Sequence, residues 1–136
     1  MTQKFDCVVI GAALNGLAMA LSLGGHAVRR PLTVALVDVR DPRDALRRAS
    51  DGRASAITMA SRRMFEALGV WDDLAAEAQS ISKIIVTDAK GAASTRPTLL
   101  SFDDEQAAHN ASMLLFENHA LLAGLVKGIE ASPNIT

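Results

Sequence analysis

The first third of the chain contains two kinds of apolar segment. Lys4–Ile10 is rich in β-branched residues, which is typical of a strand buried on both faces, and Gly11 ends it. Asn15–Leu23 is rich in Ala, Leu and Met, which favours a helix. A second apolar strand is predicted over Thr33–Val39. This order predicts a strand–helix–strand unit, the building block of a parallel sheet.

The apolar run from Cys7 to Val28 has an alternative interpretation. It carries no charged residue and is long enough to cross a bilayer. Ala18–Ala20 also has the small-x-small form of a signal-peptide cleavage site. We favour a buried strand and helix, because Asn15 and several glycines interrupt the run and because its composition changes from strand-forming to helix-forming within it.

Downstream, the pattern changes twice. Asp41–Arg53 is charged and has no periodicity, so we predict a surface loop there. Apolar residues recur on one helical face over Ile57–Leu68, and a short helix is predicted over Val70–Leu74. Closely spaced strands follow, which indicates antiparallel pairing, and an apolar stripe behind Asn118 predicts a last helix. The predicted strands are Ile81–Thr87, Thr98–Phe102 and Ser112–Phe116, with a turn at Asp88–Gly91.

These changes divide the chain into three parts. Residues 1–80 form the strand–helix–strand part, residues 81–117 form antiparallel strands, and residues 118–136 form a helix that returns to the first part. A further parallel strand should begin near Pro133–Thr136. The sequence therefore predicts an α/β fold with an incomplete parallel sheet and an antiparallel excursion.

Composition narrows the function classes. The 136 residues are 49% apolar and 21% charged with a net charge of -1, which excludes a disordered tail and gives no general attraction to nucleic acid. The arginines cluster between Arg29 and Arg63, but acidic residues interleave with them, so we predict a solvated surface. A single cysteine, Cys7, excludes an internal disulfide and indicates a cytoplasmic location. The histidines are too scattered to predict a metal site.

The turn between the first strand and helix has the pattern of a dinucleotide-binding loop. It consists of Gly11, Ala12, Ala13, Leu14, Asn15 and Gly16. The first glycine of such loops permits a sharp turn, the middle position lets the backbone approach a pyrophosphate, and the third lets helix and strand pack closely. Ala13 departs from the G-x-G-x-x-G pattern, so a small-residue turn that serves packing alone remains an alternative.

Asp38 lies 22 residues after Gly16, at the end of the second predicted strand. An acidic side chain at this position accepts hydrogen bonds from the ribose hydroxyls of an adenine dinucleotide. The alternative is an aspartate that begins an Asx-turn. Loop and acid together predict an adenine dinucleotide, and the carboxylate favours FAD or NAD over NADP because it disfavours a 2′-phosphate.

A more specific pattern is DGRASAIT followed by SRRMFEALGVWDDL. Together with DCVVIGAALNGLAMAL and VALVD, it resembles the flavin-dependent aromatic hydroxylases, most closely their ubiquinone-biosynthesis branch. The resemblance covers essentially the whole chain, in order, and corresponds to the N-terminal portion of the longer family members. It implies a Rossmann-like, glutathione-reductase-type FAD-binding fold, of which residues 1–80 and 118–136 are parts and residues 81–117 begin the substrate layer.

The resemblance also implies roles for two further residues. Arg53 matches an arginine that reaches the FAD pyrophosphate, a pairing that suits the planar guanidinium, whereas its residue type alone would favour a solvated loop arginine. Asn118 matches a polar side chain near the ribityl–phosphate portion of the flavin. A helix cap by Asn118 is equally compatible with the sequence.

The implied activity is hydroxylation of an aromatic ring, in a polyprenyl phenol of ubiquinone biosynthesis, with FAD as cofactor and NAD(P)H and O2 as co-substrates. We assign no catalytic residue, and we expect residues 1–136 alone to be inactive. We expect an exposed apolar flank that meets the remainder of the enzyme or a second copy. A lipid-soluble substrate implies a peripheral encounter with the membrane, although no segment of this sequence encodes one.

Two other functions are compatible with the loop. A non-catalytic adenine-dinucleotide-binding or interaction module is the main alternative. An NAD-dependent dehydrogenase is disfavoured, because its third parallel strand would follow soon after Asp38 rather than after an antiparallel excursion.

Overall fold

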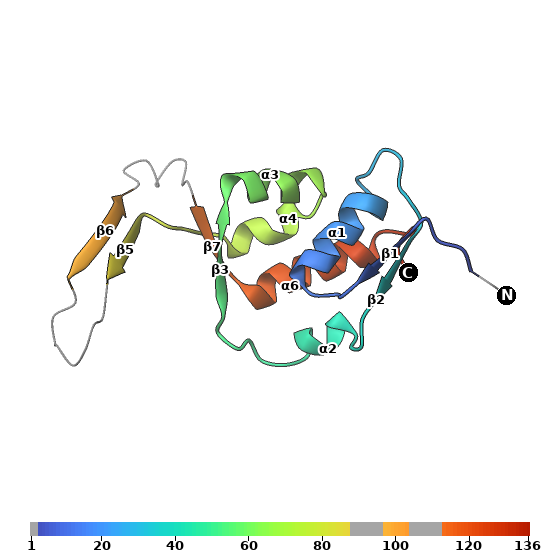
Figure 1. Cartoon of the computed structure of the whole chain (residues 1–136), viewed down its shortest axis with the longest axis horizontal. Coiled ribbons are helices and arrows are strands. Elements are labelled where there is room, and N and C mark those ends of the chain that lie inside the picture. The colour runs from blue at the N-terminus through green and yellow to red at the C-terminus, as the bar shows by residue number, and fades with distance from the viewer. Residues whose placement is uncertain (1–2, 88–96, 104–112) are drawn as a thin grey trace.

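The computed structural model describes residues 3–87, 97–103 and 113–136 (Figure 1). In chain order its elements are β1 (Cys7–Ile10), α1 (Leu14–Gly24), β2 (Val34–Val37), α2 (Pro42–Leu46), β3 (Ala54–Thr58), α3 (Met59–Ala67), α4 (Trp71–Leu74), the 3-10 turn η1 (Ala75–Glu77), β4 (Gln79–Ser80), β5 (Lys83–Thr87), β6 (Thr98–Asp103), β7 (Met113–Glu117) and α6 (Asn118–Glu130). The predicted α/β class is confirmed.

The N-terminal unit is a parallel strand pair joined through a helix. β1 and β2 run in parallel, with Cys7 opposite Val34, and α1 connects them. Val34 also forms a parallel bridge to Ile135, supported by a 3.0 Å hydrogen bond from the Thr136 N–H to the Val34 carbonyl oxygen. The strand–helix–strand prediction is therefore confirmed, and the chain returns to β2 at the place where a further parallel strand was expected.

Two antiparallel sheets complete the architecture. In the first, β7 lies between β3 and β4, and in the second β5 pairs with β6 in a hairpin that extends away from the helices (Figure 1). The predicted antiparallel character of this region is confirmed. The predicted turn at Asp88–Gly91 and the strand start at Ser112 lie outside the described residues.

The helix predicted over Ile57–Leu68 begins later than expected. Ile57 belongs to β3, and α3 starts at Met59. The boundary has a local cause, because the Thr58 hydroxyl oxygen accepts a hydrogen bond from the Ser61 N–H and caps the helix. The strand has a remote cause, since β3 pairs along its whole length with β7.

The prediction of a loop over Asp41–Arg53 is wrong for part of this segment, because it contains α2. The Asp41 carboxylate accepts a 2.9 Å hydrogen bond from the Arg43 N–H, and Pro42 occupies the first helical turn. Both are ordinary helix-start signals. The helix spans only five residues, which is too short to show a helical period.

The core lies where α1, α6 and α4 meet the parallel strands and β7. α1 and α6 lie side by side (Figure 1). The most deeply buried large side chains are Phe116, Leu17, Leu21, Leu74, Leu121, Leu125, Val34 and Val70. Trp71 meets Phe116 edge to face, with ring centroids 6.1 Å apart, and this contact fastens α4 to β7.

Apolar side chains also remain exposed on two surfaces. On β1, Val8 and Ile10 are 58% and 85% exposed. On the β5–β6 hairpin, the exposed apolar side chains are Ile85, Val86, Leu99, Leu100 and Phe102. The structure therefore has exposed apolar surface of the expected kind, while self-association stays a prediction.

Within residues 3–87, 97–103 and 113–136, no helix has the length and apolar character needed to cross a membrane. The uncharged run from Cys7 to Val28 is divided between β1, α1 and the segments beside them, as the sequence predicts.

Replacement of Phe116 tests the position of the core. We expect Phe116→Ala to lower the free energy of unfolding by about 3–5 kcal/mol, because the ring is 1% exposed and its loss leaves a cavity against Trp71. Leu115→Ala, on the opposite face of the same strand, is the control and should cost about 1 kcal/mol or less, since Leu115 is 38% exposed. Urea denaturation measures both values, and equal losses would contradict this core.

Candidate functional site

The turn after β1 is held tightly by backbone geometry. Gly11 has φ +103°, a conformation that favours glycine, and its N–H donates a 2.8 Å hydrogen bond to the Val37 carbonyl oxygen. A Cβ atom on Gly16 would overlap the carbonyl oxygen of Gly11. Both glycines of the predicted loop are therefore structurally required. Ala13 has φ −84° and ψ −177°, an extended conformation that any residue adopts, so its methyl group causes no backbone strain.

Asp38 joins the end of β2 to this turn. One carboxylate oxygen accepts a 2.6 Å hydrogen bond from the Ala12 N–H, and the other accepts a 2.9 Å bond from the Arg40 N–H. These two bonds, first that from Ala12, hold the pKa of Asp38 below its ordinary value. The Asx-turn that we considered as an alternative is thus present. It leaves lone pairs on both oxygens, so it does not exclude a ribose contact.

Arg53 lies just before β3, beside a second acidic turn. Its Nε donates a 2.7 Å hydrogen bond to the carboxylate of Asp51, and its backbone N–H donates to the other oxygen of the same group. The Arg53 side chain is 76% exposed. Because Nε alone is used in this ion pair, the Nη hydrogens remain available to a ligand.

Asn118 is the first residue of α6. Its backbone N–H donates a 2.9 Å hydrogen bond to the Arg53 carbonyl oxygen, and its side-chain Oδ1 accepts a 2.6 Å bond from the Ser55 hydroxyl. The alternative of a helix cap by Asn118 is wrong, because Glu117 occupies the cap position and no side chain caps α6. Ser55 is a residue of this region that the sequence analysis missed.

These groups surround one cavity of about 680 Å³, which we call the loop cavity. Its lining residues are Ala12, Ala13, Leu14, Asn15, Asp38, Arg40, Asp41, Pro42, Asp44, Ala45, Arg48, Ala49, Ser50, Asp51, Arg53, Asn118, His119 and Leu122. Six of the eight predicted site residues are among them, and the other two, Gly11 and Gly16, shape the turn behind it. The sequence prediction did not include Arg48 or His119.

Three helices begin at the loop cavity, and the side chain of Asp41 already caps one of them, α2. Ala13 caps α1, Glu117 caps α6, and neither cap residue makes a side-chain hydrogen bond to its helix. The first N–H groups of a helix have no partner within it, and they carry a partial positive charge. An anionic group in the loop cavity would therefore meet two favourable helix ends.

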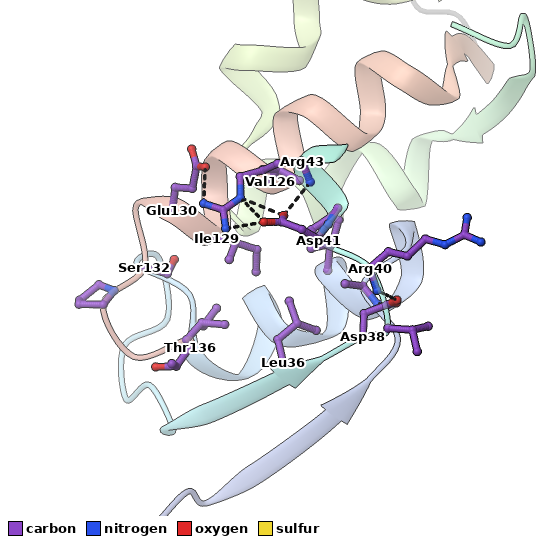
Figure 2. A pocket seen from close by; sticks show the side chains of 16 residues that line it. Leu36, Asp38, Arg40, Asp41, Arg43, Val126, Ile129, Glu130, Ser132 and Thr136 are labelled. Atoms are coloured by element: carbon purple, nitrogen blue, oxygen red, sulfur yellow. Dashed lines mark hydrogen bonds and ion pairs between the residues drawn. The ribbon is translucent and has the colours of Figure 1, made fainter. Parts of the chain in front are cut away.

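A second cavity of about 590 Å³, the strand cavity, adjoins the first (Figure 2). It lies between β2 and the C-terminal half of α6, and Asp38 and Ala12 line both cavities. Its apolar lining consists of Ala12, Leu17, Leu36, Val39, Pro42, Val126, Ile129, Pro133 and Ile135. In the described part of the chain, no three His, Cys, Asp or Glu side chains form a group that could hold a metal ion.

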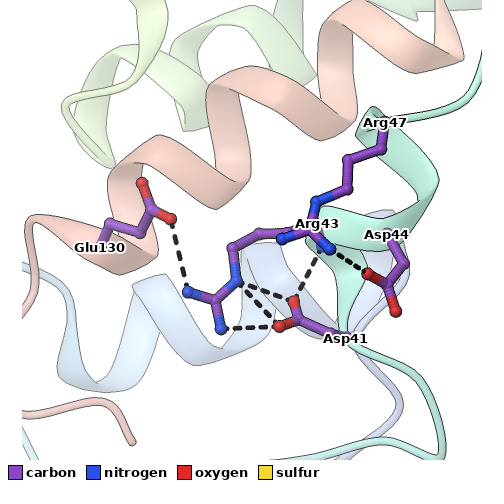
Figure 3. Close-up of polar contacts among 5 residues, drawn as sticks. All are labelled: Asp41, Arg43, Asp44, Arg47 and Glu130. Atoms are coloured by element: carbon purple, nitrogen blue, oxygen red, sulfur yellow. Dashed lines mark hydrogen bonds and ion pairs between the residues drawn. The ribbon is translucent and has the colours of Figure 1, made fainter.

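Ion pairs lie within α2 and its cap, and one reaches from α2 to α6 (Figure 3). Arg43 pairs with Asp41 at 2.7 Å and lies 3.9 Å from the carboxylate of Glu130 on α6, while Arg47 pairs with Asp44. The hydrogen bonds from Arg43 are the main cause that lowers the pKa of Asp41 to about 2. Near the other end of α2, the His119 ring lies within 3.3 Å of the Leu46 carbonyl oxygen.

The fold is that of known monooxygenases. Over 95% of this chain and 29% of its own, p-nitrophenol 4-monooxygenase PnpA from Pseudomonas putida DLL-E4 superposes with a TM-score of 0.60 at 22% identity. PqsL from Pseudomonas aeruginosa, described as a probable FAD-dependent monooxygenase, superposes over 96% of this chain and 31% of its own, with a TM-score of 0.60 at 15% identity. At these identities the likeness establishes the fold alone.

Comparison of the amino-acid sequence identifies two relatives that are more than 30% identical to part of this chain. Ubiquinone hydroxylase UbiL of Rhodospirillum rubrum is 36% identical over 83 residues, which are 61% of this chain and 18% of that protein. The mitochondrial ubiquinone biosynthesis monooxygenase COQ6 of Schizosaccharomyces pombe is 32% identical over 75 residues, 53% of this chain and 16% of that protein. No protein-family model matches. These similarities confirm the resemblance to the ubiquinone-biosynthesis hydroxylases, and the matches span less than a fifth of either relative.

Substitution of Gly16 tests the tight turn. We expect Gly16→Ala to lower the free energy of unfolding by about 2–3 kcal/mol, because the added methyl group overlaps the Gly11 carbonyl and separates α1 from β1. Met19→Ala, at an exposed position of the same helix, is the control and should change stability by about 0.5 kcal/mol or less. Thermal or urea unfolding decides the question, and a Gly16→Ala protein as stable as the wild type would refute the turn.

The Asp41–Arg43 pair predicts a dependence of stability on pH. The pKa of Asp41 is about 2 in the folded chain, below its ordinary value of 3.8. A carboxylate with a lowered pKa stabilises the fold above its unfolded-state pKa, and this contribution is lost as the pH falls through the folded-state pKa. The stability difference between wild type and Asp41→Asn should therefore be largest near neutral pH and shrink between about pH 4 and pH 2.

Urea denaturation at a series of pH values measures this difference. Asp72→Asn, which removes one carboxylate outside the network, is the control for the change in net charge. A difference between wild type and Asp41→Asn that stayed constant from pH 6 to about pH 2 would contradict the role of the ion pair.

Proposed function

We propose that this chain is the N-terminal part of an FAD-dependent monooxygenase that hydroxylates the aromatic ring of a polyprenyl phenol in ubiquinone biosynthesis, with NAD(P)H and O2. The observation that carries this proposal is the loop cavity, where residues from three separate segments of the chain meet, at 12–15, 38–53 and 118–122. The names of UbiL and COQ6 support the reaction, since both are described as acting in ubiquinone hydroxylation or biosynthesis.

The residues at the loop cavity fit the ADP half of FAD. The start of α1 and the Nη hydrogens of Arg53 would hold the pyrophosphate, because both present donors to anionic oxygens. Asp38, ionised and with free lone pairs, would accept the ribose hydroxyls. Asn118 would meet the ribityl–phosphate side. Bound FAD would accept electrons from NAD(P)H and activate O2, and hydroxylation of an aromatic ring requires both.

The strand cavity offers a place for the adenine ring. It begins at Asp38, so a base attached to a ribose held there would enter it directly. Leu36 of β2 and Ile129 of α6 line its two facing sides, which suits a flat and weakly polar ring (Figure 2). We accordingly propose that the parallel unit is Rossmann-like and of the glutathione-reductase type, with residues 1–80 and 118–136 in the FAD-binding part and residues 81–117 at the start of a substrate layer.

The other partners follow from this assignment. The exposed apolar side chains of β1 and of the β5–β6 hairpin would meet the remainder of the enzyme or a second copy. A cytoplasmic enzyme with a lipid-soluble substrate would encounter the membrane peripherally. The alternative, a non-catalytic dinucleotide-binding or interaction module, is not favoured, because the matched relatives are described as a hydroxylase and a monooxygenase.

Titration of the purified chain with FAD, NAD and NADP tests the proposal. We expect FAD to bind most tightly and NADP most weakly, because the carboxylate of Asp38 disfavours a 2′-phosphate. Arg53→Ala should weaken FAD binding about 10- to 100-fold through the loss of charge-assisted hydrogen bonds to the pyrophosphate.

Arg63→Ala is the control, since Arg63 is an exposed arginine of α3 that lines neither cavity. It should change FAD affinity by less than about twofold. Quenching of flavin fluorescence measures all of these affinities. Unchanged FAD binding by Arg53→Ala would remove the assignment of Arg53, and no binding of any dinucleotide would remove the proposed function.

A further inference from the structure

Two segments that are remote in the sequence are tied together at one side of the loop cavity. Ala54 of β3 pairs with Glu117 of β7, and the backbone N–H of Asn118 donates to the Arg53 carbonyl oxygen. Arg53 and Asn118 therefore occupy neighbouring positions on the cavity wall. Their backbones are fixed relative to each other by the strand pairing, but this pairing does not fix the direction of the Asn118 amide.

The Asn118 amide forms a hydrogen bond with Ser55. Ser55 is half-buried on β3, is not part of the cavity lining, and lies 63 positions from Asn118 in the sequence. Its hydroxyl donates a 2.6 Å hydrogen bond to Asn118 Oδ1. In this arrangement the oxygen of the planar amide faces Ser55, and the Nδ2 group is left with two hydrogens to donate. No described residue accepts a hydrogen bond from Nδ2.

We propose that Ser55 is a positioning residue that holds the Asn118 amide with its NH2 group toward the loop cavity, so that the site donates to an anionic or hydroxyl oxygen of the bound dinucleotide. This inference rests on the proposed binding of FAD. An amide free to rotate presents its oxygen to the ligand in one of its two orientations, and an oxygen facing a phosphate oxygen is repulsive. With the Ser55 hydroxyl donating to Oδ1, the amide meets the ligand in the other orientation, with its NH2 group outward.

The inference has a consequence that a purely structural bond would not have. If Ser55 acts through the amide, its hydroxyl contributes to FAD binding only while Asn118 is present. A bond that merely joins β3 to α6 is broken equally by Ser55→Ala and by Asn118→Ala, so both variants would then weaken FAD binding by the same factor. If the amide donates to the ligand, Asn118→Ala removes the donor itself and weakens binding more than Ser55→Ala does. The two single variants separate these roles, and a double-mutant cycle tests that Ser55 acts through Asn118.

The experiment measures FAD affinity and thermal stability for the 136-residue chain and a set of variants. We expect Ser55→Ala to weaken FAD binding about 3- to 10-fold, the effect of one hydrogen bond. Ser55→Thr retains the hydroxyl and should bind within about twofold of wild type. Ser55→Ala added to Asn118→Ala should weaken binding no further, and Ser22→Ala, an exposed serine of α1, should bind as the wild type does.

The outcomes are distinct. A loss of binding by Ser55→Ala, rescue by Ser55→Thr, a larger loss by Asn118→Ala, and no additional loss in the Asn118→Ala background would support the inference. Binding by Ser55→Ala equal to that of wild type, equal losses by the two single variants, or an equal loss in both backgrounds would overturn it while leaving the proposed function intact. If Ser55→Ala does not fold, Ser55→Cys, a near-isosteric replacement with a weak donor, takes its place in the same cycle. If the wild type binds no FAD, the proposed function fails and the inference fails with it.

Discussion

The packing of α6 against α1 is the contact on which the rest of the structure depends. Leu121 and Leu125 of α6 lie in the same buried cluster as Leu17 and Leu21 of α1. The first residue of α6 is Asn118, so this packing fixes one wall of the loop cavity. The chain beyond α6 reaches β2 through Ile135, so the same packing also determines which segment closes the strand cavity. One apolar contact thus sets both ends of the candidate site.

The sequence was sufficient to predict those elements whose formation depends on neighbouring residues. The strand–turn–helix from Lys4 to Leu23 could be predicted because each step depends on residues within a few positions, and the two glycines of the turn are required by their own backbone geometry. β3 could not be predicted, since its five residues become a strand through pairing with β7, whose position is fixed only in the folded chain. The placement of Arg53 beside Asn118 follows from the same pairing, whereas the family resemblance implied only that each of them lies near FAD.

Asn118 shows how tertiary contacts override a sound local interpretation. Asparagine before an apolar stripe is a frequent helix cap. Here Glu117 is extended, as the last residue of β7 paired with β3, so it takes the cap position and the helical backbone begins at Asn118. The side chain is thereby released from the backbone of its own helix and bonds to Ser55 instead. The cap position of α6 is therefore decided by the pairing of β7 with β3 and not by the local preference of asparagine. The residues around Asn118 contain no sign of that pairing, because β3 lies far away in the sequence.

The loop cavity is lined by charges of both signs. Four carboxylates line it, at Asp38, Asp41, Asp44 and Asp51, which by themselves would repel a pyrophosphate. Each of the four is engaged by N–H groups or by an arginine of the same segment, and those bonds offset its charge. Two helix N-termini and the remaining donors of Arg53 then face the cavity. The alternation of acidic and basic residues that marked a solvated surface in the sequence is therefore compatible with an anion site, because Asp41, Asp44 and Asp51 are each paired with an arginine and no side chain caps α1 or α6.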